Sequence, residues 1–298
     1  MIGSLTLDQL RVLVAIAEAG SFSAAGRELR RAQSAISQAV SNLEAIQGVE
    51  LFDRRGHRPR LTDVGRVLVD QARSVLASAT RFEAIAASTR AGVEPELTIA
   101  IDPLVPTAPL IGSLRALSET FPDLPVHFST EGLGGSLRRL RSGSAAIALC
   151  LLLPGVPDDI AAYPLLRARM HAVVAPGHPL ALLGRPATES DLAPYVQLVL
   201  SDPVDPDSAN YGVAGTRLWR FVDLGRRFDF LLAGFGWCRM PDHLVAPMIA
   251  AGELTAIEVH EDPTPPEGLI IYAAHRRDRV LGFAGRWLLD ELRRSLVS

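Results

Sequence analysis

The sequence predicts an α/β protein in which a small helical domain precedes a larger domain of alternating strands and helices. Three observations carry this prediction. Helical apolar spacing covers residues 7 to 46, an uninterrupted helical pattern covers residues 62 to 90, and short apolar runs alternate with helical patterns from residue 92 onward. A chain of 298 residues, 48% of them hydrophobic, is long enough to bury the cores of two domains.

Three short helical patterns and a charged turn occupy residues 1–61. The first pattern stops at Gly20, which is a typical helix end. Ser21 or Ser23 can cap a second helix over "SFSAAGRELRR", and a third helix runs from about Ser34 to Ile46. The segment "VELFDRRGHRPRLT" then flanks a charged turn with apolar residues, as a short β-ribbon does. Three helices and a ribbon form a winged helix-turn-helix.

Residues 62–91 are predicted to form a long linker helix. Thr62 can cap it, and Gly65 is the one glycine before its end. Small and large apolar residues occupy its heptad positions: Leu68, Ala72, Val75, Ala79, Phe82 and Ala86. A narrow apolar seam with polar flanks indicates pairing with a second copy of the chain. The alternative is that the helix packs on its own domain.

The remaining residues, 92–298, alternate between two kinds of pattern. Short apolar runs typical of strands are "LTIAI", "VHFST", "AIALCLL", "HAVVA", "YVQLVLS", "LTAIEV" and "LIIYAA". Segments with helical spacing are "LIGSLRALSETF", "GGSLRRLRSG", "DLGRRFDFLLAG", "PDHLVAPMIAAG" and "VLGFAGRWLLDELRRSL". This alternation predicts parallel sheets with helices on both faces.

Charge is unevenly distributed along the chain. The net charge is −3, yet residues 1–61 hold eight Arg against six acidic residues, so the basic surplus lies in the N-terminal domain. No apolar stretch reaches the roughly 18 residues of a membrane-spanning helix. Acidic residues also interrupt the first apolar run, which is not typical of a secretory signal. We therefore expect a cytoplasmic protein without membrane contact.

Motifs for catalysis, metal binding and cofactor binding are absent from the sequence. It contains no GxSxG, P-loop or HExxH motif, and its seven His lack ligand spacing. Cys150 and Cys238 lie far apart in apolar surroundings, which indicates buried, reduced thiols. A redox-sensing cysteine pair is the alternative. We therefore expect that the protein is not an enzyme and that it binds neither a cofactor nor a metal ion.

The third helix carries an unusual set of polar residues. Ile36, Val40 and Leu43 would form its buried stripe. The other face holds short, uncharged groups: Gln33, Ser34, Ser37, Gln38, Ser41 and Asn42. Such a face, free of carboxylates, can donate and accept hydrogen bonds at base edges in the DNA major groove. The turn that follows adds arginines that suit phosphates or the minor groove, namely Arg54, Arg55, Arg58 and Arg60.

Residues 1 to about 90 resemble the DNA-binding region of LysR-type transcriptional regulators. The resemblance rests on "LDQLRVLVAIAEAGSFSAAGREL", "QSAISQAVSNLE" and "GVELFDRRGHRPRLTDVG". It implies that the helix from Ser34 through Leu43 is the recognition helix. Base contacts then carry over to Gln33, Ser34, Ser37 and Gln38, and the wing contact to Arg54. It further implies promoter DNA as a partner, a homodimer through the linker helices, a homotetramer through the C-terminal domains, and RNA polymerase as an additional partner.

The rest of the chain is similar to the effector-binding domain of that family, which has two α/β lobes of periplasmic-binding-protein type. Matching segments include "FPDLPVHFSTEG", "RSGSAAIALCL" and "GFGWCRMPDHLV". The resemblance places lobe I at about 96–167 and 268–298, lobe II at about 168–267, and a small-molecule effector in the cleft between them. Effector contacts carry over to Asp102, Pro103, Ser136, Ser201, Trp237 and Met240.

Asp102 departs most clearly from the family, which has Ser or Thr after this strand. Its charge in the cleft would favour a cationic or hydroxylated effector over a simple carboxylate, unless an arginine pairs with it. The arginines considered are Arg167, Arg169 and Arg217. The alternatives are a surface or helix-capping role for Asp102 and a core position for Trp237. A metabolite-binding protein without a regulatory role is the alternative function that this domain alone permits.

Overall fold

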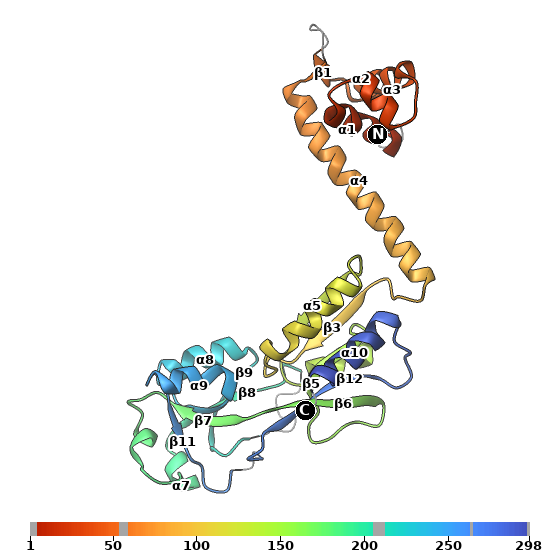
Figure 1. Ribbon diagram of the computed structural model, residues 1–298. Coiled ribbons are helices and arrows are strands. Elements are labelled where there is room, and N and C mark those ends of the chain that lie inside the picture. Colours follow the sequence, from red (N-terminus) through yellow and green to blue (C-terminus); the bar gives the residue numbers. More distant parts are fainter. Residues whose placement is uncertain (1–4, 54–58, 205–211, 263–264, 297–298) are drawn as a thin grey trace. The chain divides into compact units, whose positions relative to one another are not determined.

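The computed structural model describes residues 5–53, 59–204, 212–262 and 265–296 of the chain (Figure 1). Contacts divide the chain into two compact units, Met1–Ala87 and Ser88–Ser298. The first unit contains three short helices, a two-stranded ribbon and most of the long helix. The second contains two five-stranded sheets and the helices that cover them.

The helices of the first unit are α1 (Leu7–Ala19), α2 (Phe22–Glu28) and α3 (Gln33–Gln47). Their ends follow from local sequence. Ser21 Oγ accepts a hydrogen bond of 3.1 Å from the first turn of α2, and Gly48 ends α3 in the left-handed region with φ of +70°. Ile36, Val40 and Leu43 of α3 are buried in the common core, as their helical spacing predicts.

The ribbon pairs β1 (Phe52–Asp53) with β2 (Arg60–Leu61) in antiparallel register. Glu44 connects it to α3, because its Oε1 accepts from the backbone N–H of Leu51 at 2.8 Å and of Phe52 at 3.3 Å. The ribbon is therefore fixed against the C-terminal end of α3. The predicted wing residues Arg54, Arg55 and Arg58 lie outside the described residues.

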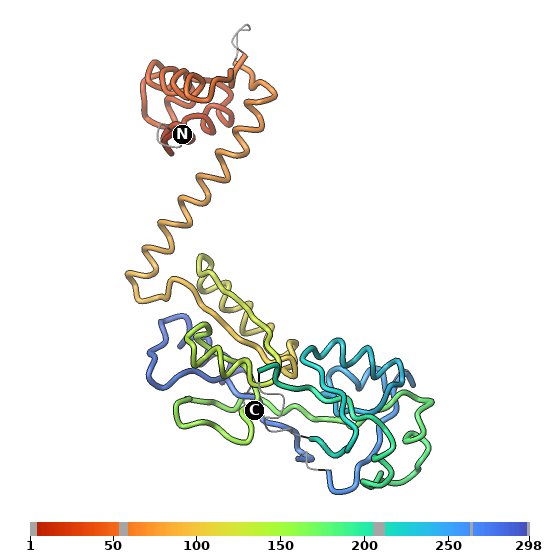
Figure 2. The backbone as a smooth tube through the Cα atoms, turned by 180° about the vertical axis from the view of Figure 1, so that it is seen from behind, coloured from red at the N-terminus to blue at the C-terminus, as the bar shows by residue number. Residues whose placement is uncertain are grey.

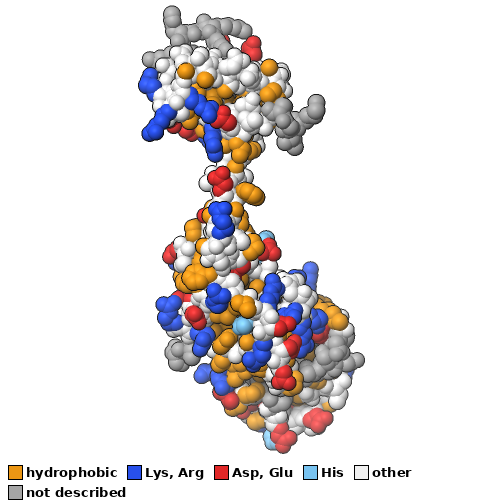
Figure 3. Space-filling model, turned by 90° about the vertical axis from the view of Figure 1, so that its right-hand side faces the viewer, with side chains coloured by type: hydrophobic (Ala, Val, Ile, Leu, Met, Phe, Trp, Pro, Cys, Tyr) orange, Lys and Arg blue, Asp and Glu red, His pale blue; other side chains and the backbone are white. Residues whose placement is uncertain are grey.

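The long helix α4 (Asp63–Arg90) begins after Thr62, whose Oγ1 accepts from the N–H of Gly65 at 2.9 Å. Val69 and Ala72 of α4 are buried in the core of the first unit, and Leu68 packs against that core. Farther along, Phe82 is 75% exposed, and Figure 3 shows apolar side chains on the open surface of the helix. Packing on the chain's own domain therefore accounts for the N-terminal part of the heptad seam, and the C-terminal part is open.

Lobe I of the second unit is built on a sheet in the order β4-β3-β5-β12-β6. Its strands are β3 (Leu97–Ile101), β4 (Val126–Thr130), β5 (Ile147–Leu151), β6 (Ile160–Ala168) and β12 (Leu269–Arg276). Its helices are η2 (Ala108–Leu110), α5 (Ile111–Thr120), α6 (Gly135–Ser142) and α10 (Phe283–Leu296). Successive strand residues face opposite sides. Ile147 and Leu149 therefore pack with α5 and α10, while Ala148 and Cys150 pack with α6.

Lobe II is built on a sheet in the order β11-β7-β10-β8-β9. Its strands are β7 (Met170–Val174), β8 (Val196–Leu200), β9 (Arg217–Phe221), β10 (Trp237–Pro241) and β11 (Thr255–Ile257). Its helices are η3 (Pro179–Leu182), α7 (Glu189–Leu192), α8 (Leu224–Leu232) and α9 (Asp242–Ala250). Cys238 and Met240 pack on the side of α8 and α9, whereas Trp237 packs on the opposite side with η3 and α7.

Both sheets are mixed, so the prediction of parallel sheets is wrong in part. β3 is parallel to β4 and β5, but β12 is antiparallel to β5 and β6, and β7 is antiparallel to β10 and β11. The chain leaves lobe I at the end of β6 and returns to it with β12 (Figure 2), so β6 and β12 run in opposite directions side by side. Strands β6, β9 and β10 lie outside the predicted runs because Pro164, Arg220 and Arg239 break their apolar patterns.

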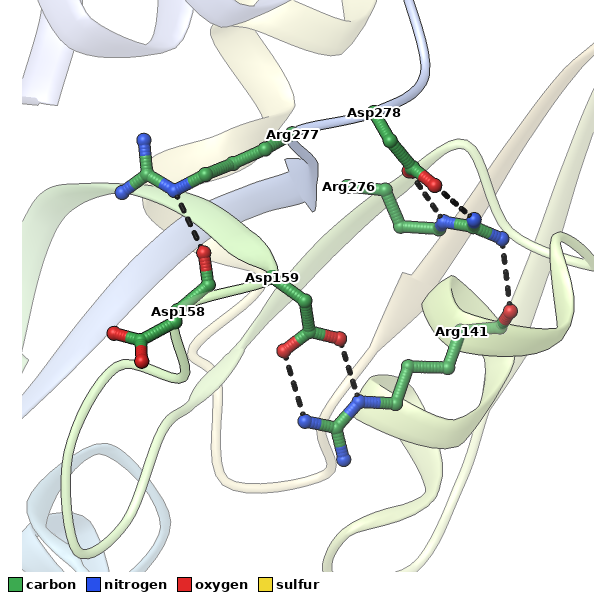
Figure 4. A network of polar contacts seen from close by, with 6 residues as sticks. All are labelled: Arg141, Asp158, Asp159, Arg276, Arg277 and Asp278. Carbon is green, nitrogen blue, oxygen red and sulfur yellow. Dashed lines mark hydrogen bonds and ion pairs between the residues drawn. The ribbon is translucent and has the colours of Figure 1, made fainter.

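One end of lobe I carries an exposed polar network (Figure 4). Arg141 at the end of α6 makes two hydrogen bonds to the Asp159 carboxylate, at 2.8 and 2.9 Å, and its own carbonyl accepts from Arg276 at 3.0 Å. Arg277 Nε donates to the carbonyl of Asp158 at 3.0 Å. The network joins α6, the start of β6 and the end of β12, but solvent screening leaves such surface pairs with a small effect on stability.

Candidate functional sites

The predicted polar side chains of α3 share one face of the helix. Gln33, Ser34, Gln38 and Asn42 are exposed, and Ser37 and Ser41 are half-buried at the edges of the face. The buried stripe holds the helix against the domain from the other side. No carboxylate lies on the exposed face over these residues, because Glu44 binds the ribbon backbone instead.

Two features prepare this face for an external partner. Gln38 Nε2 donates to Asn42 Oδ1 at 2.8 Å, which leaves the carbonyl oxygen of Gln38 and the amide protons of Asn42 for a partner outside the helix. Ala32, the N-cap residue of α3, makes no side-chain hydrogen bond to the first turn. An N-terminus without a side-chain cap presents backbone N–H groups and the positive end of the helix dipole, which suit a phosphate.

In the second unit, three of the six predicted effector contacts line one cavity of about 130 Å³ between the lobes. Asp102 follows β3, Ser136 lies in the first turn of α6, and Ser201 follows β8. Lobe I therefore supplies Asp102 and Ser136, and lobe II supplies Ser201. Pro103 is half-buried beside Asp102 and is not part of the cavity wall.

Asp102 is buried, with 3% of its surface exposed, so a surface position is ruled out. Its Oδ1 accepts from the backbone N–H of Leu104 at 2.9 Å. Burial raises the pKa of Asp102 to about 6, although the hydrogen bond from Leu104 lowers it. Among the described residues no arginine pairs with this carboxylate; Arg167 donates to the carbonyl of Gly268 and Arg217 to that of Pro194.

The two serines differ in their hydrogen bonds. Ser201 Oγ donates to the carbonyl of Phe221 at 3.4 Å, whereas the buried Ser136 Oγ has no partner among the described residues. Beside them, Arg138 of α6 forms an ion pair with Asp202 after β8, and this pair joins the two lobes. Asp202 also lines the cavity, and its position directly after Ser201 is a signal that sequence reasoning missed.

Trp237 and Met240 do not join this cavity. Both are fully buried in lobe II, on opposite sides of its sheet, and neither is part of the cavity wall. The core position considered for Trp237 is therefore the one observed. The effector role predicted for these two residues gains no support from their placement.

The cysteines lie in different sheets, Cys150 in β5 and Cys238 in β10, and both are free and buried. Burial, together with the charge of Asp102, raises the pKa of Cys150 to about 12. Burial also raises the pKa of Cys238, although the neighbouring Arg227 opposes this. A raised pKa disfavours the thiolate, which is the form of cysteine that reacts with oxidants.

Among the described residues, no group of three or more His, Cys, Asp or Glu side chains could hold a metal ion. None of the described helices is long and apolar enough to cross a membrane.

Comparison with known proteins places both units in one family. Residues 7–66 match the bacterial regulatory helix-turn-helix protein, lysR family, and residues 90–297 match the LysR substrate binding domain. The chain is 33% identical to the HTH-type transcriptional regulator YhaJ of Escherichia coli, over 97% of this chain and 96% of YhaJ.

Solved structures agree on the fold. A cysteine mutant of OxyR from Corynebacterium glutamicum is 25% identical, with a TM-score of 0.56 over 97% of this chain and 92% of that chain. CrgA of Neisseria meningitidis, a LysR-type transcriptional regulator, is 23% identical, with a TM-score of 0.52 over 98% of this chain and 99% of that chain, and shows the fold alone. The chain therefore belongs to the LysR family of bacterial helix-turn-helix transcriptional regulators.

Proposed function

We propose that the exposed face of α3 reads promoter DNA at Gln33, Ser34, Ser37, Gln38 and Asn42. One observation carries the proposal: the buried stripe turns these uncharged hydrogen-bonding groups to the surface while Glu44 is held away from them. A glutamine can make two hydrogen bonds to adenine in the major groove, which gives Gln38 a direct role in sequence choice. Arg60, exposed on β2, and the wing arginines would add phosphate contacts.

The regulatory ligand in this proposal is a small molecule that donates hydrogen bonds to Asp102, Ser136 and Ser201. Asp102 has one backbone donor and Ser136 Oγ has no partner among the described residues, so both have unused capacity for a hydroxyl or ammonium group. Because the three residues come from both lobes, binding would shift the balance between lobe arrangements and thereby the DNA complex.

Assembly through α4 completes the proposal. Val75 and Phe82 are exposed apolar residues of α4, and a second copy of the chain can cover them. We propose a homodimer through this seam and a homotetramer through the C-terminal domains. In this role the chain binds promoter DNA and catalyses no reaction.

Selection of preferred sites from random DNA, followed by binding measurements on Gln38→Ala, tests the proposal. We expect Gln38→Ala to lose about 1–3 kcal/mol of binding free energy at the selected site and to relax the preference at one base pair. Gln47→Ala, at the far end of the same helix, is the matched control and should keep the selected preference. Selection without a preferred sequence, or equal losses of Gln38→Ala on selected and random DNA, would contradict direct reading by α3.

A further inference from the structure

The turn between α2 and α3 ends α2 in a Schellman motif. The N–H of Arg31 donates to the carbonyl of Gly26 at 2.8 Å, and the N–H of Arg30 donates to the carbonyl of Arg27 at 3.2 Å. Arg30 occupies the position of this motif that adopts the left-handed conformation, with φ of +54°. Glycine normally fills that position, because a Cβ there lies too close to the backbone. Arg30 is therefore in a conformation that is unfavourable for its residue type.

The surrounding structure holds this turn in place. Gly26 is buried, and a Cβ on it would lie 2.8 Å from the carbonyl oxygen of Arg31, so the turn passes directly over α2. The side chain of Arg31 also pairs with Asp8 of α1 at 2.7 Å. Strained residues persist where their surroundings fix them, and they gather at functional sites. An arginine where a glycine would be relaxed raises the question of what its side chain does.

The side chain of Arg30 is exposed, and it has no hydrogen bond or ion pair within the part of the chain that the structure describes. Its neighbours differ, because Arg31 binds Asp8 and Arg27 Nη1 donates to Ser23 Oγ at 3.4 Å. Three residues along the chain from Arg30, α3 begins at Gln33, so the two Cα atoms are at most about 11 Å apart. A long side chain at that distance can reach the phosphates that border a groove occupied by α3.

We propose that Arg30 binds a DNA phosphate beside the exposed face of α3, and that the left-handed turn sets the direction of its side chain. This inference rests on the proposed reading of DNA by α3 and adds a contact outside both that helix and the ribbon. A guanidinium suits a phosphate because two of its N–H groups match two phosphate oxygens. The contact positions α3 without choosing a base, since phosphate contacts carry no sequence information.

Binding of the full-length protein to labelled duplex DNA, measured over a series of salt concentrations, tests the inference. The duplexes are the site selected in the preceding experiment and a random sequence. Arg30→Gly should bind both about eightfold more weakly at about 0.1 M salt, because one phosphate contact with a salt slope of about −0.9 contributes that factor relative to about 1 M salt. The size of the slope should fall by about 0.9 for each bound chain. Arg30→Lys keeps the charge and should keep the slope.

Thermal unfolding of the same variants excludes misfolding as the cause. Arg30→Gly should melt at a higher temperature than the wild type, because glycine adopts this φ without strain. Among the described residues, Glu261 in lobe II is the other non-glycine residue with a positive φ, +55°, and is the matched control. Glu261→Gly should also raise the melting temperature but leave DNA binding unchanged.

A third variant separates charge from backbone conformation. Arg30→Asn places an uncharged residue that tolerates the left-handed conformation, and it should lose DNA affinity as Arg30→Gly does. An Arg30→Asn protein that binds DNA as tightly as the wild type, or an Arg30→Gly protein that keeps the wild-type salt slope, would overturn the inference.

Failure of the proposed DNA role gives a different result. A wild-type protein that binds neither duplex would contradict the reading of DNA by α3 and, with it, the role of Arg30. Binding that Gln38→Ala weakens at the selected site, and that no Arg30 variant changes on either duplex, would overturn the role of Arg30 alone.

Discussion

The exposed face of α3 and the interlobe cavity both carry polar side chains, but those of α3 are in contact with water and those of the cavity are buried. Gln33, Ser34, Gln38 and Asn42 are exposed, so water satisfies their hydrogen bonds when no partner is bound. Asp102 and Ser136 are buried with unused hydrogen-bonding capacity. Burying such groups without partners is unfavourable. The comparison indicates that the exposed polar face of α3 is nearly neutral for stability, whereas the buried polar groups of the cavity lower the stability of the domain that holds them.

The largest predicted effect is on the free energy of unfolding and concerns the buried stripe that holds α3 against its domain. Ile36→Ala removes a fully buried side chain beneath α3 and should lower the free energy of unfolding of the N-terminal unit by about 2–5 kcal/mol. Ile46→Ala, on the same helix, changes an isoleucine that is 40% exposed and should have a much smaller effect. Denaturant unfolding followed by circular dichroism measures both variants. Equal losses would show that the buried stripe is not what fixes the face.

Sequence periodicity predicts the exposed polar face of α3 because a single helix contains all the residues that form it. Ile36, Val40 and Leu43 fix which side is buried, and the polar side follows. Thr62 and Gly48 are equally local signals, and both mark helix ends in the structure.

The interlobe cavity forms only when distant segments of the chain come together, and a single sequence does not show such tertiary contacts directly. Resemblance to the family brought Asp102, Ser136 and Ser201 together, although they are spread over three elements of two lobes. The sequence around Trp237 does not distinguish a core position from a ligand site, because a large aromatic residue fits both; the structure places it in the core of lobe II.

The next largest effect concerns Asp102 and depends on pH. Its pKa is raised from 3.8 to about 6 by burial, so the folded state binds a proton more tightly than the unfolded state does. The stability from this proton is fully present below the unfolded pKa and is lost as pH rises through about 6. The shift corresponds to up to about 3 kcal/mol. Asp102→Asn should therefore become increasingly more stable than the wild type as pH rises from about 4 to about 8.

Thermal unfolding across this pH range measures the difference between the two proteins. Asp229→Asn, an exposed position on α8, is the matched control and should follow the wild type at every pH. A constant difference between Asp102→Asn and the wild type would mean that Asp102 does not titrate in this range, and the contrast with the exposed face would lose its main support.

The smallest effect is expected at the reading face itself. Gln38 and Asn42 form one exposed hydrogen bond at i,i+4 spacing, and such pairs stabilise a helix by about 0.2–0.5 kcal/mol. Gln38→Ala, Asn42→Ala and the double variant form a cycle whose coupling free energy, measured by denaturant unfolding, should lie in that range. A coupling above about 1 kcal/mol would exceed what solvent-exposed pairs provide. The face would then be a stabilising element as well as a reading surface, and DNA contacts at Gln38 would have to compete with the bond to Asn42.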